Sequence, residues 1–176
     1  MSYLAAAVVL LGVLCGLNLV MMLAIVRRLR QLAERAPEDA VRLPPGVLAP
    51  EFSAATVSGS VISLSGLTGA RSMVAFLAAN CPPCHEQVPS FAAYARSVPG
   101  GAAQVLAVVV GGTDAETAQL AGDLEGTASV ALESVAGPLQ KAFSVTGFPT
   151  FYLLDDMGRI QVSAPTMRGV PAFQTA

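Results

Sequence analysis

Charged residues are scarce in this chain, which has one histidine and three cysteines among its 176 residues. Aspartate, glutamate, lysine and arginine together make up 12% of it, whereas apolar residues make up 53%. Such a balance excludes an intrinsically disordered chain, which has few apolar and many charged residues. It is also too apolar for an ordinary soluble domain, so part of the chain is expected to lie in a different environment.

Much of the apolar excess lies in residues 3–26, which include no charge and only Asn18 as a strongly polar residue. At about 1.5 Å per residue, a helix of this length spans about 36 Å, enough for the roughly 30 Å hydrocarbon core of a bilayer. A cleaved signal peptide would need a basic start, a shorter apolar region and a small-x-small cleavage site, and the sequence has none of these. Residues 1–35 are therefore predicted to be a transmembrane anchor helix with a basic flank, and residues 3–26 its membrane contact.

Basic residues are concentrated directly after the apolar segment, at Arg27, Arg28, Arg30 and Arg35. The positive-inside rule places such a cluster, and the chain that follows it, in the cytoplasm. Residues 43–176 carry five basic and nine acidic side chains, a net charge of −4. No face for binding nucleic acid is expected there.

Prolines and a glycine interrupt every periodic pattern between residues 36 and 48, which are predicted to be a linker before a domain of residues 49–176. Apolar runs typical of buried strands occupy residues 72–78, 104–110 and 150–154. Turn residues at 155–158 predict a hairpin from the last of these strands to residues 159–162. Helices are expected at residues 83–97, 114–124 and 135–143. This alternation predicts an α/β domain with a central mixed sheet flanked by helices.

A Cys-Pro-Pro-Cys sequence occupies residues 81–84, where a buried strand is expected to end and a helix to begin. Free N–H groups and the positive end of the helix dipole stabilise a thiolate there, so Cys81 is the predicted exposed nucleophile. Two intervening residues bring the sulfurs close enough to form an intramolecular disulfide, with Cys84 as the resolving thiol. Near a strand–helix–strand pattern, this spacing is typical of a thioredoxin-like redox motif.

Other interpretations of the two cysteines stay open. They can be structural thiols of a redox-inactive binding module. They can also be half of a zinc site, but that site would need a second pair of ligands, and the only other cysteine and histidine in the sequence are Cys15 and His85. Residues 81–85 also match the Cys-x-x-Cys-His pattern of c-type haem attachment, with a methionine as the second axial ligand. Two prolines opening a helix after a buried strand favour the redox site, for which no metal or organic cofactor is needed.

Residues 49–52, 62–65 and 74–84 together resemble the membrane-anchored thioredoxin-like thiol–disulfide oxidoreductases of the TlpA type. Residues 143–150 and 153–160 match the second half of that family's pattern, so the resemblance covers roughly residues 49–162. It implies a thioredoxin-like fold and exchange of electrons with protein thiols and disulfides, together with a redox partner protein. The family normally closes with a helix, which is expected to be short or missing here because residues 168–176 are few and contain glycine and proline.

By the same resemblance, Pro149 is the family's cis-proline. The loop of Phe148, Pro149 and Thr150 would then face the disulfide and hold the extended backbone of a substrate chain. The interval between Cys84 and Pro149 is longer than in plain thioredoxin, which matches the strand–helix insertion of the TlpA group. The anchor and residues 30–37 are similar to the MauD group of methylamine-utilisation proteins, which implies a domain outside the cytoplasmic membrane, against the positive-inside rule.

Some positions depart from the family's pattern. The buried acid that many thioredoxins place six residues before the first cysteine is Ala75, which leaves His85 and Glu86 as the nearby candidates for proton transfer to Cys84. The Thr-x-x-Cys signature of peroxiredoxins would need threonine at Ala78, so a peroxidase is disfavoured.

The two prolines of the motif also bear on redox direction. Pro82 and Pro83 have no N–H, so the thiolate of Cys81 is expected to be stabilised mainly by the helix dipole and by Cys84. A strong oxidant needs a more fully stabilised thiolate, and the motif therefore favours a reductant.

Overall fold

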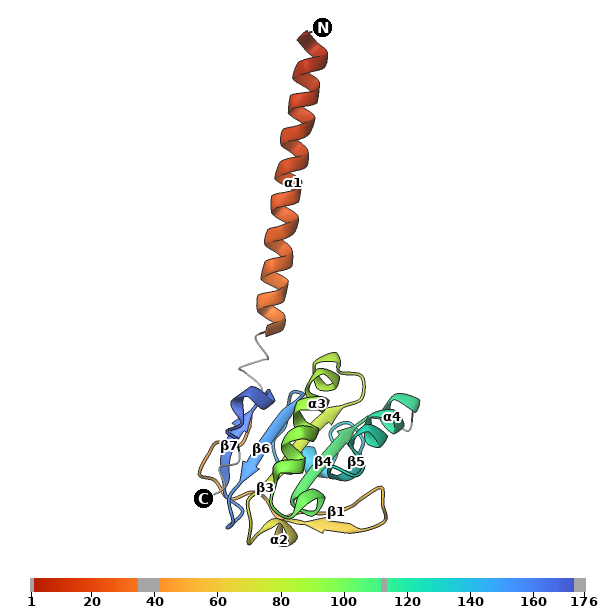
Figure 1. Cartoon of the computed structure of the whole chain (residues 1–176), viewed down its shortest axis with the longest axis vertical. Helices are drawn as coiled ribbons and strands as arrows, with labels where there is room; N and C mark the ends of the chain where they lie inside the picture. The colour runs from red at the N-terminus through yellow and green to blue at the C-terminus, as the bar shows by residue number, and fades with distance from the viewer. Residues whose placement is uncertain (1, 35–41, 112–113, 173–176) are drawn as a thin grey trace. The chain divides into compact units, whose positions relative to one another are not determined.

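The computed structural model of the protein describes residues 2–34, 42–111 and 114–172. The chain divides into two compact units, Met1–Glu38 and Asp39–Ala176. The first contains a single helix and the second an α/β domain (Figure 1). Residues 35–41, which include the first six residues of the predicted linker, and residues 173–176 of the predicted domain lie outside the described residues.

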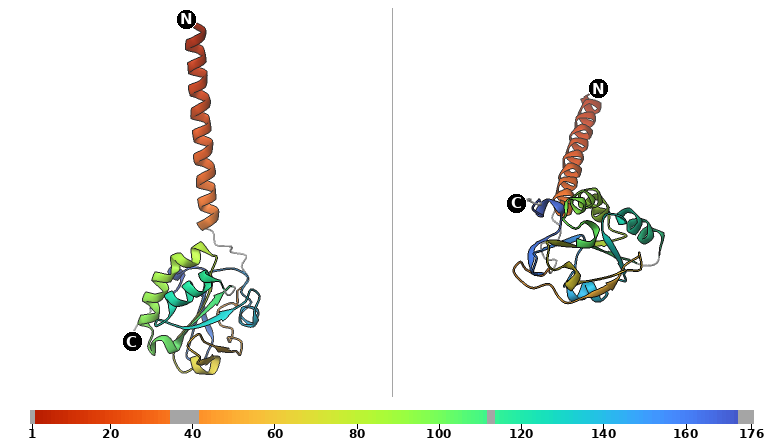
Figure 2. Two further views of the ribbon diagram at one scale, coloured as in Figure 1. Left: turned by 90° about the vertical axis from the view of Figure 1, so that its right-hand side faces the viewer. Right: turned by 60° about the horizontal axis from the view of Figure 1, so that its bottom comes forward.

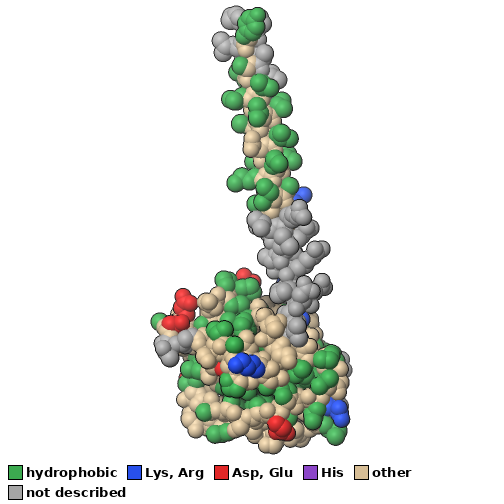
Figure 3. Space-filling view, turned by 180° about the vertical axis from the view of Figure 1, so that it is seen from behind, with side chains coloured by type: hydrophobic (Ala, Val, Ile, Leu, Met, Phe, Trp, Pro, Cys, Tyr) green, Lys and Arg blue, Asp and Glu red, His purple; other side chains and the backbone are tan. Residues whose placement is uncertain are grey.

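The first unit is the helix α1, Ser2–Glu34, whose described side chains are almost all apolar (Figure 3). Its segment Leu10–Arg27 has a mean hydropathy of 2.2, and none of this segment is buried inside the protein. The side-chain amide of Asn18 donates to the carbonyl oxygen of Leu14 at 3.1 Å, so this polar group is bonded within the helix. The predicted apolar helix is present and is long enough to cross a membrane, although a signal sequence near the N-terminus meets the same criteria.

The second unit is built on a five-stranded sheet with the strand order β5-β4-β3-β6-β7. The strands are β3 (Ser72–Ala78), β4 (Val105–Val110), β5 (Ser129–Glu133), β6 (Thr150–Leu154) and β7 (Ile160–Ala164). β3, β4 and β5 run parallel, whereas β6 is antiparallel to both β3 and β7. The predicted central mixed sheet is therefore confirmed, with β3 in its middle.

Helices cover both faces of the sheet (Figure 2). α3 (Pro82–Ser97) and α4 (Ala115–Leu124) pack on one face, and α5 (Pro138–Ala142) packs on the other. Each face of the sheet has its own hydrophobic core, and successive side chains of β3 point alternately into one and the other. Leu77 lies in the same core as Phe91 of α3, whereas Phe76 packs against Phe143 and Tyr152 on the other face. A strand buried on both faces explains the uninterrupted apolar run in the sequence.

Several short elements have no clear pattern in the sequence. They are the hairpin of β1 (Ser53–Ala55) and β2 (Val61–Ser63), the helix α2 (Leu64–Leu67), and the 3-10 turns η1 (Gly101–Gln104) and η2 (Met167–Gly169). Strand β5 was not predicted either, because it is short and takes its place in the sheet only by pairing with β4. Helix α4 and strand β5 are among the elements that lie in the long interval between Cys84 and Pro149.

Helix α5 is shorter than the helix expected at residues 135–143. Ala136 has a φ of 59°, in the left-handed region, which prevents the helix from starting earlier. Pro138 then occupies the first turn, where its missing N–H costs nothing. The carboxylate of Glu133 accepts the N–H of Leu139 at 2.6 Å and that of the next residue at 2.9 Å, so β5 supplies the partners for the start of α5.

Residues 43–48, the end of the predicted linker, lie against the domain. The N–H of Gly46 donates to the carbonyl oxygen of Ile160 at 2.7 Å, and the N–H of Ile160 donates to Val47 at 2.9 Å. Leu48 forms an isolated bridge with Arg159. This segment therefore runs beside the start of β7.

The chain after β7 forms the 3-10 turn η2 and, within residues 165–172, no α-helix. The N–H of Met167 donates to Oε1 of Gln87 on α3 at 2.9 Å. Met167 and Val170 are buried in the core that α3 shares with the sheet. Along these described residues, a short turn stands where the resemblance calls for a longer helix.

Candidate active site

The Cys-Pro-Pro-Cys sequence joins the central strand β3 to helix α3. Ala79, just after β3, donates its N–H to the carbonyl oxygen of Val110 at 3.0 Å, which holds the end of the strand beside β4. Cys81 is the N-cap of α3, and the two prolines fill the first two helical positions. Proline suits these positions because their N–H groups have no partner within the helix.

The two cysteines have unequal surroundings. Cys81 is half-buried, whereas Cys84 is 0% exposed and belongs to the core of the α3 face. Their sulfurs are joined in a disulfide across one helical turn, with the Cα atoms 5.2 Å apart, which is the pairing that the spacing predicts. The N–H of Cys84 donates to Sγ of Cys81 at 3.3 Å, so the sulfur of Cys81 serves as the helix cap.

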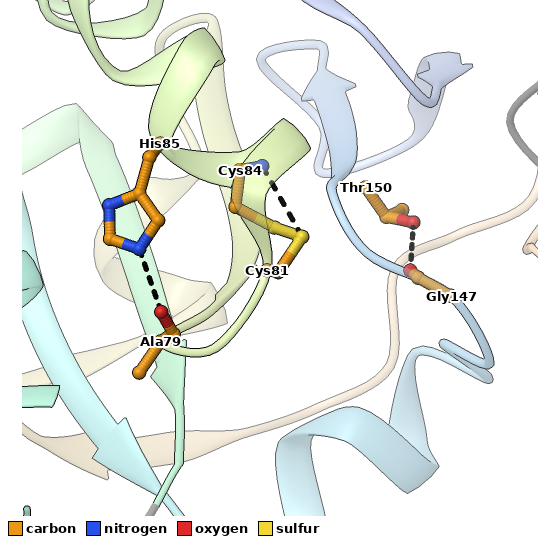
Figure 4. The surroundings of a disulfide bond; sticks show 6 residues. All are labelled: Ala79, Cys81, Cys84, His85, Gly147 and Thr150. Carbon is orange, nitrogen blue, oxygen red and sulfur yellow. Dashed lines mark hydrogen bonds between the residues drawn. A yellow bond between two sulfur atoms is a disulfide. The ribbon is translucent and has the colours of Figure 1, made fainter. Parts of the chain in front are cut away.

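The loop of Phe148, Pro149 and Thr150 lies on one side of this disulfide (Figure 4). The Phe148–Pro149 peptide bond is cis, as the resemblance implied. Thr150 begins β6 opposite Phe76 of β3, and its hydroxyl donates to the carbonyl oxygen of Gly147 at 2.8 Å. Pairing of β3 with β6 therefore brings the loop next to the cysteines.

His85 lies on the opposite side of the disulfide from Thr150 (Figure 4). Its Nε2 is 2.7 Å from the carbonyl oxygen of Ala79, and because a carbonyl only accepts, this nitrogen carries the proton. Glu86 is exposed in the first turn of α3. Of the hydrogen bonds in the described part of the chain, only that from Cys84 reaches the sulfur of Cys81.

Ala75 occupies the position where many thioredoxins have a buried acid. It is 0% exposed and lies in the same core as Cys84. The buried polar side chains of the described residues are uncharged, namely Thr56, Ser72, Thr117, Gln140 and Thr150. The surroundings of Cys84 are therefore apolar.

A hollow of about 430 Å³ opens beside Cys81 on the α4 side. Its walls come from the two residues that follow β3, from the start of α3 and from Glu116 and Gln119 of α4. Sequence reasoning missed these two residues, since nothing local connects them with a motif so far away along the chain. Helix α4 itself was predicted, and only the packing of the sheet places it beside Cys81.

The first turn of α4 is held by Asp114, its N-cap. Oδ1 of Asp114 accepts hydrogen bonds from the N–H and the hydroxyl of Thr117 at 2.8 and 2.7 Å. These bonds favour the ionised carboxylate and lower the pKa of Asp114. The geometry of the wall that faces Cys81 thus depends on an ionised cap.

Comparison with known proteins agrees with this arrangement. The thioredoxin-like protein YneN of Bacillus subtilis is 28% identical over 126 residues, which cover 69% of this chain and 71% of YneN. A thiol:disulfide interchange protein DsbE of Chlorobium tepidum is similar in structure, with a TM-score of 0.52, 29% identity, and coverage of 69% of this chain and 84% of that one. The thioredoxin domain of the thiol-disulfide oxidoreductase BVU-2223 of Bacteroides vulgatus has a TM-score of 0.56 at 20% identity, covering 69% of this chain and 88% of that one.

These similarities confirm the predicted thioredoxin-like fold. The sequence pattern of the AhpC/TSA family matches residues 45–163. This range begins in the segment that precedes β1 and ends within β7. The match covers more than half of the chain and includes both cysteines and the Pro149 loop. The chain therefore belongs to the AhpC/TSA family of thioredoxin-like proteins.

Proposed function

We propose that the protein is a membrane-anchored thiol–disulfide oxidoreductase of the TlpA type that acts on protein disulfides through Cys81 and Cys84. The observation that carries this proposal is the disulfide at the start of α3, with one half-buried and one buried sulfur, flanked by the loop that contains Pro149. The names of YneN and DsbE support the same chemistry.

The reaction starts from the reduced pair. The thiolate of Cys81 attacks one sulfur of a substrate disulfide, which forms a mixed disulfide and releases the other substrate sulfur as a thiolate. Cys84 then loses its proton and attacks the sulfur of Cys81, so the internal disulfide forms and the second substrate sulfur leaves. Two electrons and the proton of Cys84 pass to the substrate, whose other thiolate takes a proton from solvent, and a dithiol of a redox partner protein must restore the reduced pair.

Phe148, Pro149 and Thr150 are proposed to hold the substrate backbone during this exchange. Their loop flanks the disulfide, and Pro149 itself is buried while Phe148 remains partly accessible. His85 and Glu86 are the proposed proton carriers for Cys84, because no carboxylate is buried among the residues that the structure describes.

The proposed direction is reduction of the substrate. The first two positions of α3 are prolines, so Sγ of Cys81 receives a hydrogen bond from Cys84 alone among the described residues. Fewer donors mean a less stabilised thiolate and hence a more reducing pair.

Helix α1 is the proposed anchor, with the domain outside the cytoplasmic membrane. Its length and hydropathy support a membrane span. The proposed side of the membrane follows from the similarity to the MauD group, whereas the positive-inside rule predicts the opposite side. A topology experiment distinguishes the two.

Two other activities have less support. A peroxidase is suggested by the name of the family, but Ala78, 6% exposed, stands where the peroxiredoxin signature has threonine. Covalent haem attachment would require the disulfide between the two cysteines to be broken. It would also require Nε2 of His85 to give up its hydrogen bond to the carbonyl oxygen of Ala79.

Reduction of insulin disulfides by the full-length chain in neutral detergent tests the proposal. We expect insulin to precipitate with dithiothreitol as electron source, and Cys81→Ser to abolish the acceleration. A chain that consumes peroxide but not insulin disulfides would point to the peroxidase, and a Soret band to the haem protein.

A further inference from the structure

We propose that the hollow beside Cys81 is a subsite for a lysine or arginine side chain of the partner polypeptide, close to that polypeptide's reacting sulfur. This inference rests on the proposed function, because it concerns a chain that exchanges a disulfide with Cys81. His85, which lines the hollow, and Thr150 lie on opposite sides of the disulfide (Figure 4). The subsite is therefore separate from the loop proposed to hold the substrate backbone.

Close packing fixes the α4 wall of the hollow. A Cβ atom at Gly111 would clash with Oγ1 of Thr117 and would lie 3.3 Å from the Cβ atom of Ala79, so the glycine allows α4 to approach the end of β3. Thr117 is 2% exposed and is bonded twice to Asp114. The first turn of α4 is thus held in one position beside the active-site loop.

This turn presents Glu116 to the hollow. Glu116 and Gln119 are three residues apart, which places them on one side of the helix, and both line the hollow. Thr117 and Leu120, the buried neighbours of this pair, point into the domain. Across the described ranges, no hydrogen bond or ion pair engages the carboxylate of Glu116, so it is available to a ligand.

The opposite wall adds acceptors and an apolar surface. Because Nε2 of His85 donates to the carbonyl oxygen of Ala79, Nδ1 is the ring nitrogen left to accept a hydrogen bond. The exposed side chain of Asn80 contributes an amide. Pro82 adds an exposed ring that suits the methylene groups of a long basic side chain.

Charge around the hollow selects the same ligand. Residues 114–125 include four carboxylates and no basic residue. Of the residues that the structure describes, no lysine or arginine lines the hollow. A cationic side chain is therefore attracted and an acidic one repelled, which affects encounter and orientation more than final affinity.

The partner's basic residue must lie near its cysteine in sequence. The hollow includes Cys81 in its wall, and successive residues of an extended chain are about 3.3 Å apart. A lysine or arginine within about two residues of the reacting cysteine can thus reach Glu116 while the sulfurs meet. The subsite orients the partner and takes no part in the exchange of bonds.

Three otherwise identical cysteine peptides test the subsite. Each carries lysine, glutamine or glutamate beside a cysteine that is blocked as a mixed disulfide with thionitrobenzoate, whose release is coloured. With the reduced full-length chain in neutral detergent, and with the exposed thiol of Cys15 replaced by Cys15→Ser throughout, we expect the lysine peptide to react about fivefold faster than the glutamate peptide. The difference should shrink at high salt.

Variants of α4 assign the preference to Glu116. Glu116→Gln should bring the ratio of the two rates close to one, and Glu116→Lys should reverse it. Asp123→Asn is the matched control, because Asp123 is exposed on the same helix but does not line the hollow, and it should keep the wild-type ratio. Circular dichroism of each variant checks that it is folded. If Glu116→Lys does not fold, the rate ratio of Glu116→Gln is sufficient to test the subsite.

Two results would overturn the inference in distinguishable ways. Equal rates for all three peptides, or a lysine preference that survives in Glu116→Gln, would reject the subsite while leaving disulfide exchange intact. Failure of the wild-type chain to release thionitrobenzoate from any peptide would reject the proposed function itself, and the subsite with it.

Discussion

The N–H of Cys84 donates to Sγ of Cys81 at 3.3 Å, and it is the first amide after Cys81 that is able to donate. Pro82 and Pro83 fill the intervening positions and have no N–H. The same turn leaves Cys81 half-buried and places Cys84 in the core. The two sulfurs are therefore chemically unequal, and their roles can be separated by experiment.

Replacing Cys84 should trap the reaction at its midpoint. Cys84→Ser cannot resolve the mixed disulfide, so we expect Cys81 to stay covalently joined to substrate proteins. Non-reducing gels of the full-length chain, with Cys15→Ser in every variant, would reveal these adducts. The paired variant Cys81→Ser should trap none, and adducts formed only in that variant would reverse the two roles.

The redox potential should be closer to thioredoxin's, about −270 mV, than to that of a strong oxidant, about −120 mV. Equilibration of the Cys15→Ser chain with glutathione buffers measures it. Pro83→Ala restores an N–H near Sγ of Cys81, and a charge-assisted hydrogen bond of about 1.5–3 kcal/mol would raise the potential by about 30–60 mV. A wild-type value above about −150 mV would make the protein a disulfide donor.

Proton transfer from Cys84 is expected to depend on the first turn of α3. If His85 accepts the proton, His85→Gln keeps a donor for the carbonyl of Ala79 but has no ring nitrogen to accept it, so insulin reduction should slow. Glu86→Gln is the matched variant on the next residue. An unchanged rate in both variants would assign the transfer to solvent.

Membrane orientation can be read directly. Alkaline phosphatase fused after Ala176 should be active if the domain lies outside the cytoplasmic membrane, and protease added to intact spheroplasts should cleave the domain. An inactive fusion with a protected domain would instead follow the positive-inside rule set by the arginines after α1.

The α4 cap should make stability depend on pH. Hydrogen bonds from Thr117 lower the pKa of Asp114 in the folded protein. The cap therefore stabilises the domain at pH values above the ordinary pKa of aspartate, and this stabilisation is lost as the pH falls through the lowered pKa of Asp114. Asp114→Ala should lower the Tm by a few degrees at neutral pH and by less near pH 3. Thermal melts with Asp123→Asn as control check this, and a Tm difference that is the same at both pH values would contradict it.

Local sequence was sufficient for the elements that carry the cysteines. The apolar run of β3, the two prolines at the start of α3 and the two-residue spacing of the cysteines all act within one turn or strand. The hairpin of β6 and β7 also follows from its turn, where Oδ1 of Asp155 accepts the N–H groups of Met157 and Arg159 and Gly158 has a φ of 78°. Capping, turn chemistry and burial pattern are short-range effects, so the sequence alone determined these features.

Tertiary structure decided which distant residues meet at the site. Pro149 flanks the disulfide because β6 pairs with β3, with Thr150 opposite Phe76, and no local signal specifies that register. Glu116 lines the same hollow as Cys81 because Gly111 and the buried Thr117 let α4 pack beside the residue that follows β3. Strand pairing and close packing join segments far apart along the chain, and their free energy depends on the whole sheet rather than on neighbouring residues.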